Sequence, residues 1–82
     1  MAVEDAAMTR MVQRELGRRY VDSSRLDVRV THGVCYLRGV LEKLRFYPEV
    51  DLEHEAELIR KLLRQKPGIR EVIWEVYVRA PR

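Results

Sequence analysis

An apolar residue recurs at every fourth position between Met8 and Tyr20. This spacing lines the side chains up on one face of an α-helix, so we expect a helix over about residues 4–20. A second apolar stripe of the same kind runs from Leu52 to Leu63 and predicts another helix over about residues 52–66. Acidic residues gather at the start of both segments and basic residues at the end, as the helix dipole favours.

Between and after these segments, apolar and polar residues alternate, which is typical of half-buried strands. The alternation predicts strands over about residues 26–31, 34–42 and 70–79. His32 and Gly33 separate the first two strands and predict a tight hairpin turn. Gly39 interrupts the second strand and indicates a bulge or the close approach of another element. Residues 43–51 contain Pro48 and follow no period, so we expect an extended arm and then a loop.

The predicted order of elements is therefore helix, strand, strand, helix, strand. A chain of 82 residues is long enough for one domain, covering residues 1–82. We expect an α+β fold, a two-layer α-β-β-α-β sandwich in which two helices cover one face of a three-stranded mixed sheet. Because the second helix forms a crossover, the last strand should run parallel to one strand of the hairpin. The pattern leaves open which one.

Composition narrows the class of protein. Hydrophobic residues make up 46% of the chain and charged residues 35%, which predicts an ordered domain. The net charge of +3 permits an acidic partner without requiring one. Asparagine is absent from the sequence and glutamine is scarce, as in heat-adapted proteins. The first residues are acidic and no long apolar run follows, so we expect a cytoplasmic protein without a signal peptide or a membrane span.

Two short motifs resemble a known family. The predicted hairpin reads Gly33-Val34-Cys35-Tyr36-Leu37-Arg38-Gly39-Val40-Leu41, and the second helix is followed by Gly68-Ile69-Arg70-Glu71-Val72 and an apolar strand. In these motifs the chain resembles the BON domain, the module named for bacterial osmotic-shock and nodulation proteins. The resemblance covers most of the chain and implies a non-enzymatic binding module. BON domains often bind phospholipid surfaces or other envelope proteins, and the resemblance implies ligands of these kinds. The family is usually periplasmic.

Few residues are candidates for catalysis. His32 falls in the predicted turn, and Cys35 falls on a predicted core face. His54 lies among glutamates at the predicted start of the second helix, where we expect an acidic turn exposed to solvent. The sequence has no histidine pair at metal-ligand spacing, no nucleophile with a nearby base and no glycine-rich phosphate loop. We therefore expect no enzyme activity, no metal site and no cofactor.

If both helices cover one face of the sheet, the other face carries an exposed aromatic patch. Its predicted anchors are two tyrosines, with a basic rim around them. Such a patch favours a protein partner or a second copy of the chain, and the alternative is an ordinary solvated sheet face. The predicted binding residues of this face are Arg29, Tyr36, Arg38, Ile73, Tyr77 and Arg79.

A basic stripe on the first helix and an aromatic loop form an alternative site. They would bind an anionic phospholipid surface, although the same arginines also suit an ordinary solubilising face. Nucleic acid is disfavoured, because no two glycines have the Gly-x-x-Gly spacing of KH-like RNA binders. A purely structural, monomeric domain without a ligand remains a third interpretation. The residues of the alternative site are Arg10, Arg14, Arg18, Phe46 and Tyr47.

Overall fold

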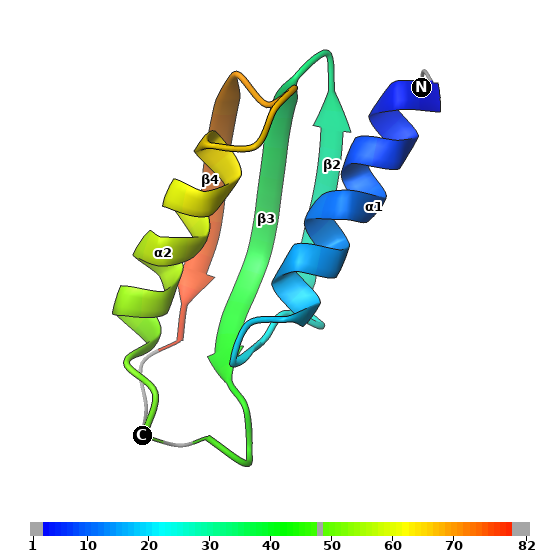
Figure 1. Ribbon diagram of the computed structural model, residues 1–82. Helices are drawn as coiled ribbons and strands as arrows, with labels where there is room; N and C mark the ends of the chain where they lie inside the picture. Colours follow the sequence, from blue (N-terminus) through cyan, green and yellow to red (C-terminus); the bar gives the residue numbers. More distant parts are fainter. Residues whose placement is uncertain (1–2, 48, 80–82) are drawn as a thin grey trace.

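The computed structural model describes residues 3–47 and 49–79, so Pro48 lies outside the described residues (Figure 1). Within them it contains two helices and a four-stranded sheet, which confirms the α+β class. The elements in chain order are α1 (Val3–Gly17), β1 (Val21–Asp22), β2 (Leu26–Thr31), β3 (Val34–Lys43), α2 (Leu52–Arg64) and β4 (Glu71–Val78).

The predicted number of strands is wrong, because the segment after α1 forms a fourth, short strand. β1 pairs antiparallel with the end of β3, where Val21 lies opposite Lys43. The Val21 side chain is buried in the core. A single apolar residue before Asp22 gives no alternation to detect, so the sequence indicated only a polar connection.

Helix α1 is shorter than predicted and ends at Gly17, because glycine is a poor helix former. Beyond it, the Arg18 N–H donates to the Glu15 carbonyl at 3.2 Å and the Arg19 N–H to the Leu16 carbonyl at 3.1 Å. These bonds tighten the chain into a turn. Tyr20 therefore lies outside the helix and is exposed, and its predicted place in the apolar stripe is wrong.

Strand β3 is the centre of the sheet. It pairs antiparallel with β2, from Leu26 opposite Gly39 to Thr31 opposite Val34. On its other edge it pairs with β4, which runs parallel to it, as the crossover predicted. β1 continues the line of β2 along β3.

Two glycine positions shape the sheet. His32 and Gly33 both have positive φ, 52° and 80°, which gives the predicted tight turn between β2 and β3. Gly39 has a φ of 128°, and a Cβ there would collide with the Arg25 carbonyl oxygen. The predicted close approach at Gly39 is thus confirmed: the backbone before β2 passes directly against it.

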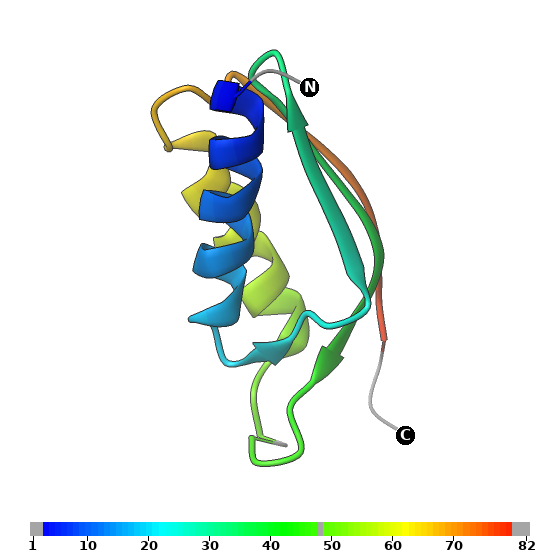
Figure 2. The ribbon, with the colours of Figure 1, turned by 90° about the vertical axis from the view of Figure 1, so that its right-hand side faces the viewer.

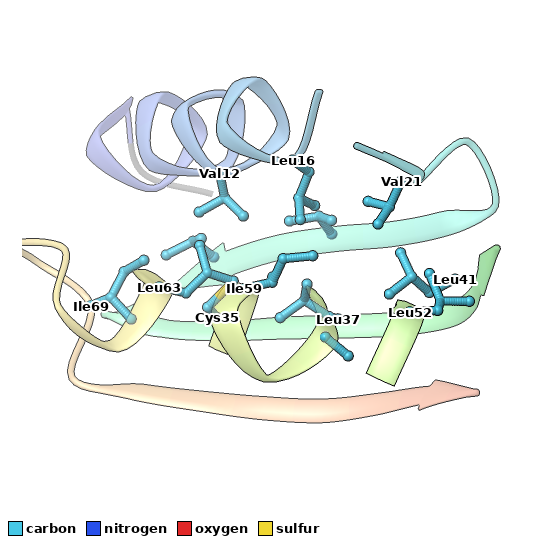
Figure 3. Packing of buried hydrophobic residues seen from close by; sticks show 13 residues of the cluster. Val12, Leu16, Val21, Cys35, Leu37, Leu41, Leu52, Ile59, Leu63 and Ile69 are labelled. Carbon is cyan, nitrogen blue, oxygen red and sulfur yellow. The ribbon is translucent and has the colours of Figure 1, made fainter. Parts of the chain in front are cut away.

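Both helices lie against the same face of the sheet (Figure 2). Their buried side chains meet those of the strands in one hydrophobic core (Figure 3). The predicted stripe of α2 is confirmed, since its residues Leu52, Ala56, Ile59 and Leu63 are all buried. The core residues that the helices contribute are Val12, Leu16, Leu52, Ala56, Ile59 and Leu63, and the strands add Val21, Val28, Val30, Cys35, Leu37 and Leu41.

Candidate binding face

The sheet face that turns away from both helices is named here the open face. Alternation along each strand decides which side chains it carries. Because Val28, Leu37 and Cys35 point into the core, their neighbours in sequence point the other way. The open face comprises Asp27, Arg29 and Thr31 of β2, Val34, Tyr36, Arg38, Val40 and Glu42 of β3, and Glu71, Ile73, Glu75 and Tyr77 of β4.

The strand register arranges these side chains in rows across the sheet. One row runs Arg29, Tyr36, Ile73, and the next runs Asp27, Arg38, Glu75. Arg38 therefore lies in the middle of the face between two carboxylates, and its predicted place in a basic rim is wrong. The row of charges also separates Tyr36 from Tyr77, so the predicted aromatic patch is not continuous.

A shallow hollow of about 330 Å³ lies on this face. Tyr36 is 43% exposed and Tyr77 is 64% exposed, so both phenol rings remain accessible. Ile73 is half-buried beside Tyr36, whereas Val34 is buried although it belongs to the same face. The residues that line the hollow are Asp27, Arg29, Thr31, Tyr36, Arg38 and Glu75.

Three lining residues, Asp27, Thr31 and Glu75, were not among the predicted site residues. Alternation already placed them on the same side as Tyr36, which is the signal that could have found them. The sequence does not show which residue of β4 pairs with which residue of β3. That pairing is what puts Glu75 next to Arg38.

Arg79, another predicted site residue, lies just beyond β4 at one end of the open face. Its Nη1 atom is 3.1 Å from Oε2 of Glu42, while Nε of Arg25 is 3.3 Å from the other oxygen of the same carboxylate. Glu42 thus joins two arginines from the two sides of β3. The position of Arg79 is fixed by this pair, and its side chain is still 44% exposed.

The residues of the alternative site divide between helix α1 and one end of the molecule. Arg10 and Arg14 are exposed on α1, whereas Arg18 lies beyond the helix and pairs with Glu15 at 3.5 Å. Phe46 is 87% exposed, and the ring of Tyr47 lies 4.9 Å from that of Tyr20. We call Tyr20, Phe46 and Tyr47 the aromatic tip.

The candidates for catalysis lie in different surroundings: Cys35 is in the core, whereas His32 and His54 are exposed. Cys35 is buried, and this burial raises the pKa of its thiol to about 11. His32 occupies the hairpin turn, and the His54 N–H donates to the Asp51 carboxylate that caps α2. In the described residues no group of three or more His, Cys, Asp or Glu side chains is placed to hold a metal ion.

No family model matches this chain, and no curated protein matches it. Neither of the two described helices is long and apolar enough to cross a membrane. Function is therefore inferred from the arrangement of the residues themselves.

Proposed function

We propose that this chain is a non-enzymatic, BON-like interaction module that binds a protein partner through its open face. One observation carries the proposal: Tyr36, 43% exposed, stands in a hollow between side chains of both charges. A tyrosine offers a large apolar ring with a polar end, and such residues are enriched among the anchors of protein interfaces.

The distribution of charge favours a protein over a polyanion. Arg38 is flanked by Asp27 on one strand and Glu75 on the other. These carboxylates weaken the positive potential that a phosphate-rich surface needs. A protein partner can present an acid to Arg38 and a base to each carboxylate, which fixes its orientation on the face.

The two-layer arrangement gives this face its role in the proposal. The helices form one layer and pack against the core side of the sheet, so the hydrophobic core does not use the other side. A partner would complete the third layer. Tyr36 would be its central anchor and Tyr77 the anchor nearer the Arg79 end.

Cross-linking with competition tests this proposal. A photoreactive residue in place of Val40, which lies beside Tyr77 in the register, should cross-link one partner protein. Excess wild-type chain should suppress that product, whereas a Tyr36→Ala, Tyr77→Ala double variant with an unchanged circular dichroism spectrum should not. Tyr20→Ala is the matched control, because the exposure of Tyr20, 55%, lies between those of Tyr36 and Tyr77, but Tyr20 lies on the aromatic tip. Competition by the double variant as strong as that of the wild type would overturn the proposal.

The aromatic tip supports a second candidate function, peripheral binding to anionic membranes. Phe46 is 87% exposed, and Tyr20 and Tyr47 are also exposed, so the tip presents a group of aromatic rings to solvent and not a single one. Arg45, its neighbour, and Arg18, just beyond the end of α1, are also exposed. Aromatic rings next to arginines suit the boundary between headgroups and acyl chains.

Vesicle co-sedimentation separates this candidate from the first. Membrane binding predicts retention on vesicles with anionic lipid at low salt, loss at high salt, and loss in a Phe46→Ser variant. The Tyr36→Ala, Tyr77→Ala variant should sediment as the wild type does. Absence of binding at low salt, or binding that is indifferent to lipid charge, rules the membrane candidate out.

A further inference from the structure

The two outer edges of the sheet differ in how their backbone groups are used. The β2 edge is closed by side chains of α1. The Val30 N–H donates to Thr9 Oγ1 at 2.9 Å, and the His32 N–H donates to Asp5 Oδ1 at 3.2 Å. Two donors near the turn end of this edge, which another strand would need, are therefore already occupied.

The β4 edge is open. In the described part of the chain, β4 pairs with β3 alone. The Arg79 N–H donates to the Leu41 carbonyl at 2.9 Å. The regular pairing of β3 with β4 extends this direction back along the strand, so the amides of Ile73, Glu75 and Tyr77 also face β3. The amides of even-numbered residues, from Val72 to Val78, consequently point outward. The eight residues of β4 include no proline, glycine or lysine, the residues that commonly prevent a further strand from pairing with an edge.

The inward side chains of β4 are also incompletely covered. Val72, Trp74, Val76 and Val78 are only partly buried, although they pack against the core. In β2, at the opposite edge, Val28 is 7% exposed and Val30 is fully buried. The Arg60 guanidinium lies 5.0 Å from the Trp74 ring and provides a polar cover there. A further strand beside β4 would complete this burial.

We propose that a second copy of the chain adds its own β4 antiparallel to this edge, across a two-fold axis at Glu75. In this register Val72 lies opposite the partner copy's Val78, and Trp74 lies opposite the partner copy's Val76. These are outward-facing residues, so the pairs exchange backbone hydrogen bonds. On the open face, Ile73 meets the partner copy's Tyr77 and Glu71 meets the partner copy's Arg79.

The charges fit the same arrangement. The one like-charged pair is Glu75 with its own symmetry mate, and Arg38 lies next to each Glu75 on β3. The outer flank of α2 carries Glu57 and then Arg60 and Arg64, which line a common hollow. The two-fold axis sets the two α2 helices antiparallel, so the acidic half of one flank faces the basic half of the other.

This inference concerns the β4 edge and stands independently of the protein partner proposed for the open face. In the dimer the two sheets become one, and the two open faces lie side by side. Tyr36 belongs to the open face but not to the edge. A Tyr36→Ala variant should therefore lose the protein partner and keep the dimer, which makes the failure of either proposal distinguishable.

Engineered cysteines test the register in the full chain, with Cys35→Ala as background. Residues opposite each other in a non-hydrogen-bonded antiparallel pair have Cα atoms about 4.5 Å apart, within the range of a disulfide. Glu75→Cys should therefore form a covalent dimer under mild oxidation. Glu71→Cys is the matched control on the same strand and face, and its two copies would be roughly 25 Å apart.

Sedimentation velocity adds a measurement without cross-linking. The wild-type chain should dimerise, and Glu75→Gln should strengthen the dimer at least several-fold because it removes the like-charged pair. Val76→Pro should weaken the dimer, because the Val76 amide points away from β3, towards the second copy. If this variant does not fold, the comparison of Glu75→Cys with Glu71→Cys still tests the register. A monomer at all concentrations, or equal cross-linking of Glu71→Cys and Glu75→Cys, overturns the proposal.

Discussion

The guanidinium group of Arg19 binds both carboxylate oxygens of Glu55. Nη2 lies 3.1 Å from Oε1 and 3.0 Å from Oε2, and Nε lies 3.2 Å from Oε1. Arg19 follows the end of α1 and Glu55 lies in α2, so this pair fastens the two helices together. Glu55 is buried, which corrects the expectation that the glutamates at the start of α2 form a solvated group.

Removing Arg19 should destabilise the fold. Arg19→Ala leaves the buried Glu55 carboxylate without its partner, at a cost of about 2 kcal/mol in the free energy of unfolding. This expected loss of stability is smaller than for a fully buried ion pair, because the Arg19 side chain is 28% exposed. Urea unfolding measures it. Arg18→Ala is the control: that side chain is 67% exposed, and its loss should change stability by less than about 0.5 kcal/mol.

Gly39 should not tolerate a side chain. Gly39→Ala demands a φ near 128° from an L-residue and drives the Cβ into the Arg25 carbonyl, so we expect a loss of about 3 kcal/mol. Gly17→Ala offers a matched comparison, since a Cβ at Gly17 would meet nothing within 4 Å. It should be neutral or stabilising by up to about 1 kcal/mol. Thermal unfolding of both variants decides, and similar melting temperatures would contradict this account.

The hydroxyl of Thr9 should stabilise the fold and keep the β2 edge closed. It donates to the Asp5 carbonyl at 2.9 Å and accepts the Val30 N–H at the same distance. Thr9→Val leaves that edge amide without a partner and should cost about 1–2 kcal/mol. Thr9→Ser keeps the hydroxyl and should stay closer to the wild type. Hydrogen exchange at Val30 provides the readout, and protection that is unchanged in Thr9→Val would contradict the role.

The sequence predicted the fold well wherever a pattern was long enough to have a period. The stripe from Leu52 to Leu63 and the alternation from Leu26 to Val30 both hold in the structure. Strand β1 was not predicted, because its burial depends on pairing with the end of β3, which is distant in the sequence.

The candidate site was predictable only in part, and for the same physical reason. Alternation assigned Tyr36 and Tyr77 to one face, and both are exposed there. Register is a long-range property, and no local pattern shows that Glu75 pairs with Arg38. The position of Glu55 was equally hidden, because its partner Arg19 lies 36 residues away in the sequence.

Cys35 should make stability fall with pH in the alkaline range. Burial raises the pKa of its thiol from 9.0 to about 11, so the unfolded chain releases this proton at lower pH than the folded chain does. The contribution is therefore complete below pH 9 and is lost as the pH rises towards 11. One pH unit above the unfolded pKa, the loss should be about 1.4 kcal/mol. Urea unfolding at roughly pH 8 and pH 10 measures it, and Cys35→Ala, which has no thiol, should show a smaller decrease by that amount. Equal decreases in the two proteins would show that the thiol titrates alike in the folded and unfolded chains.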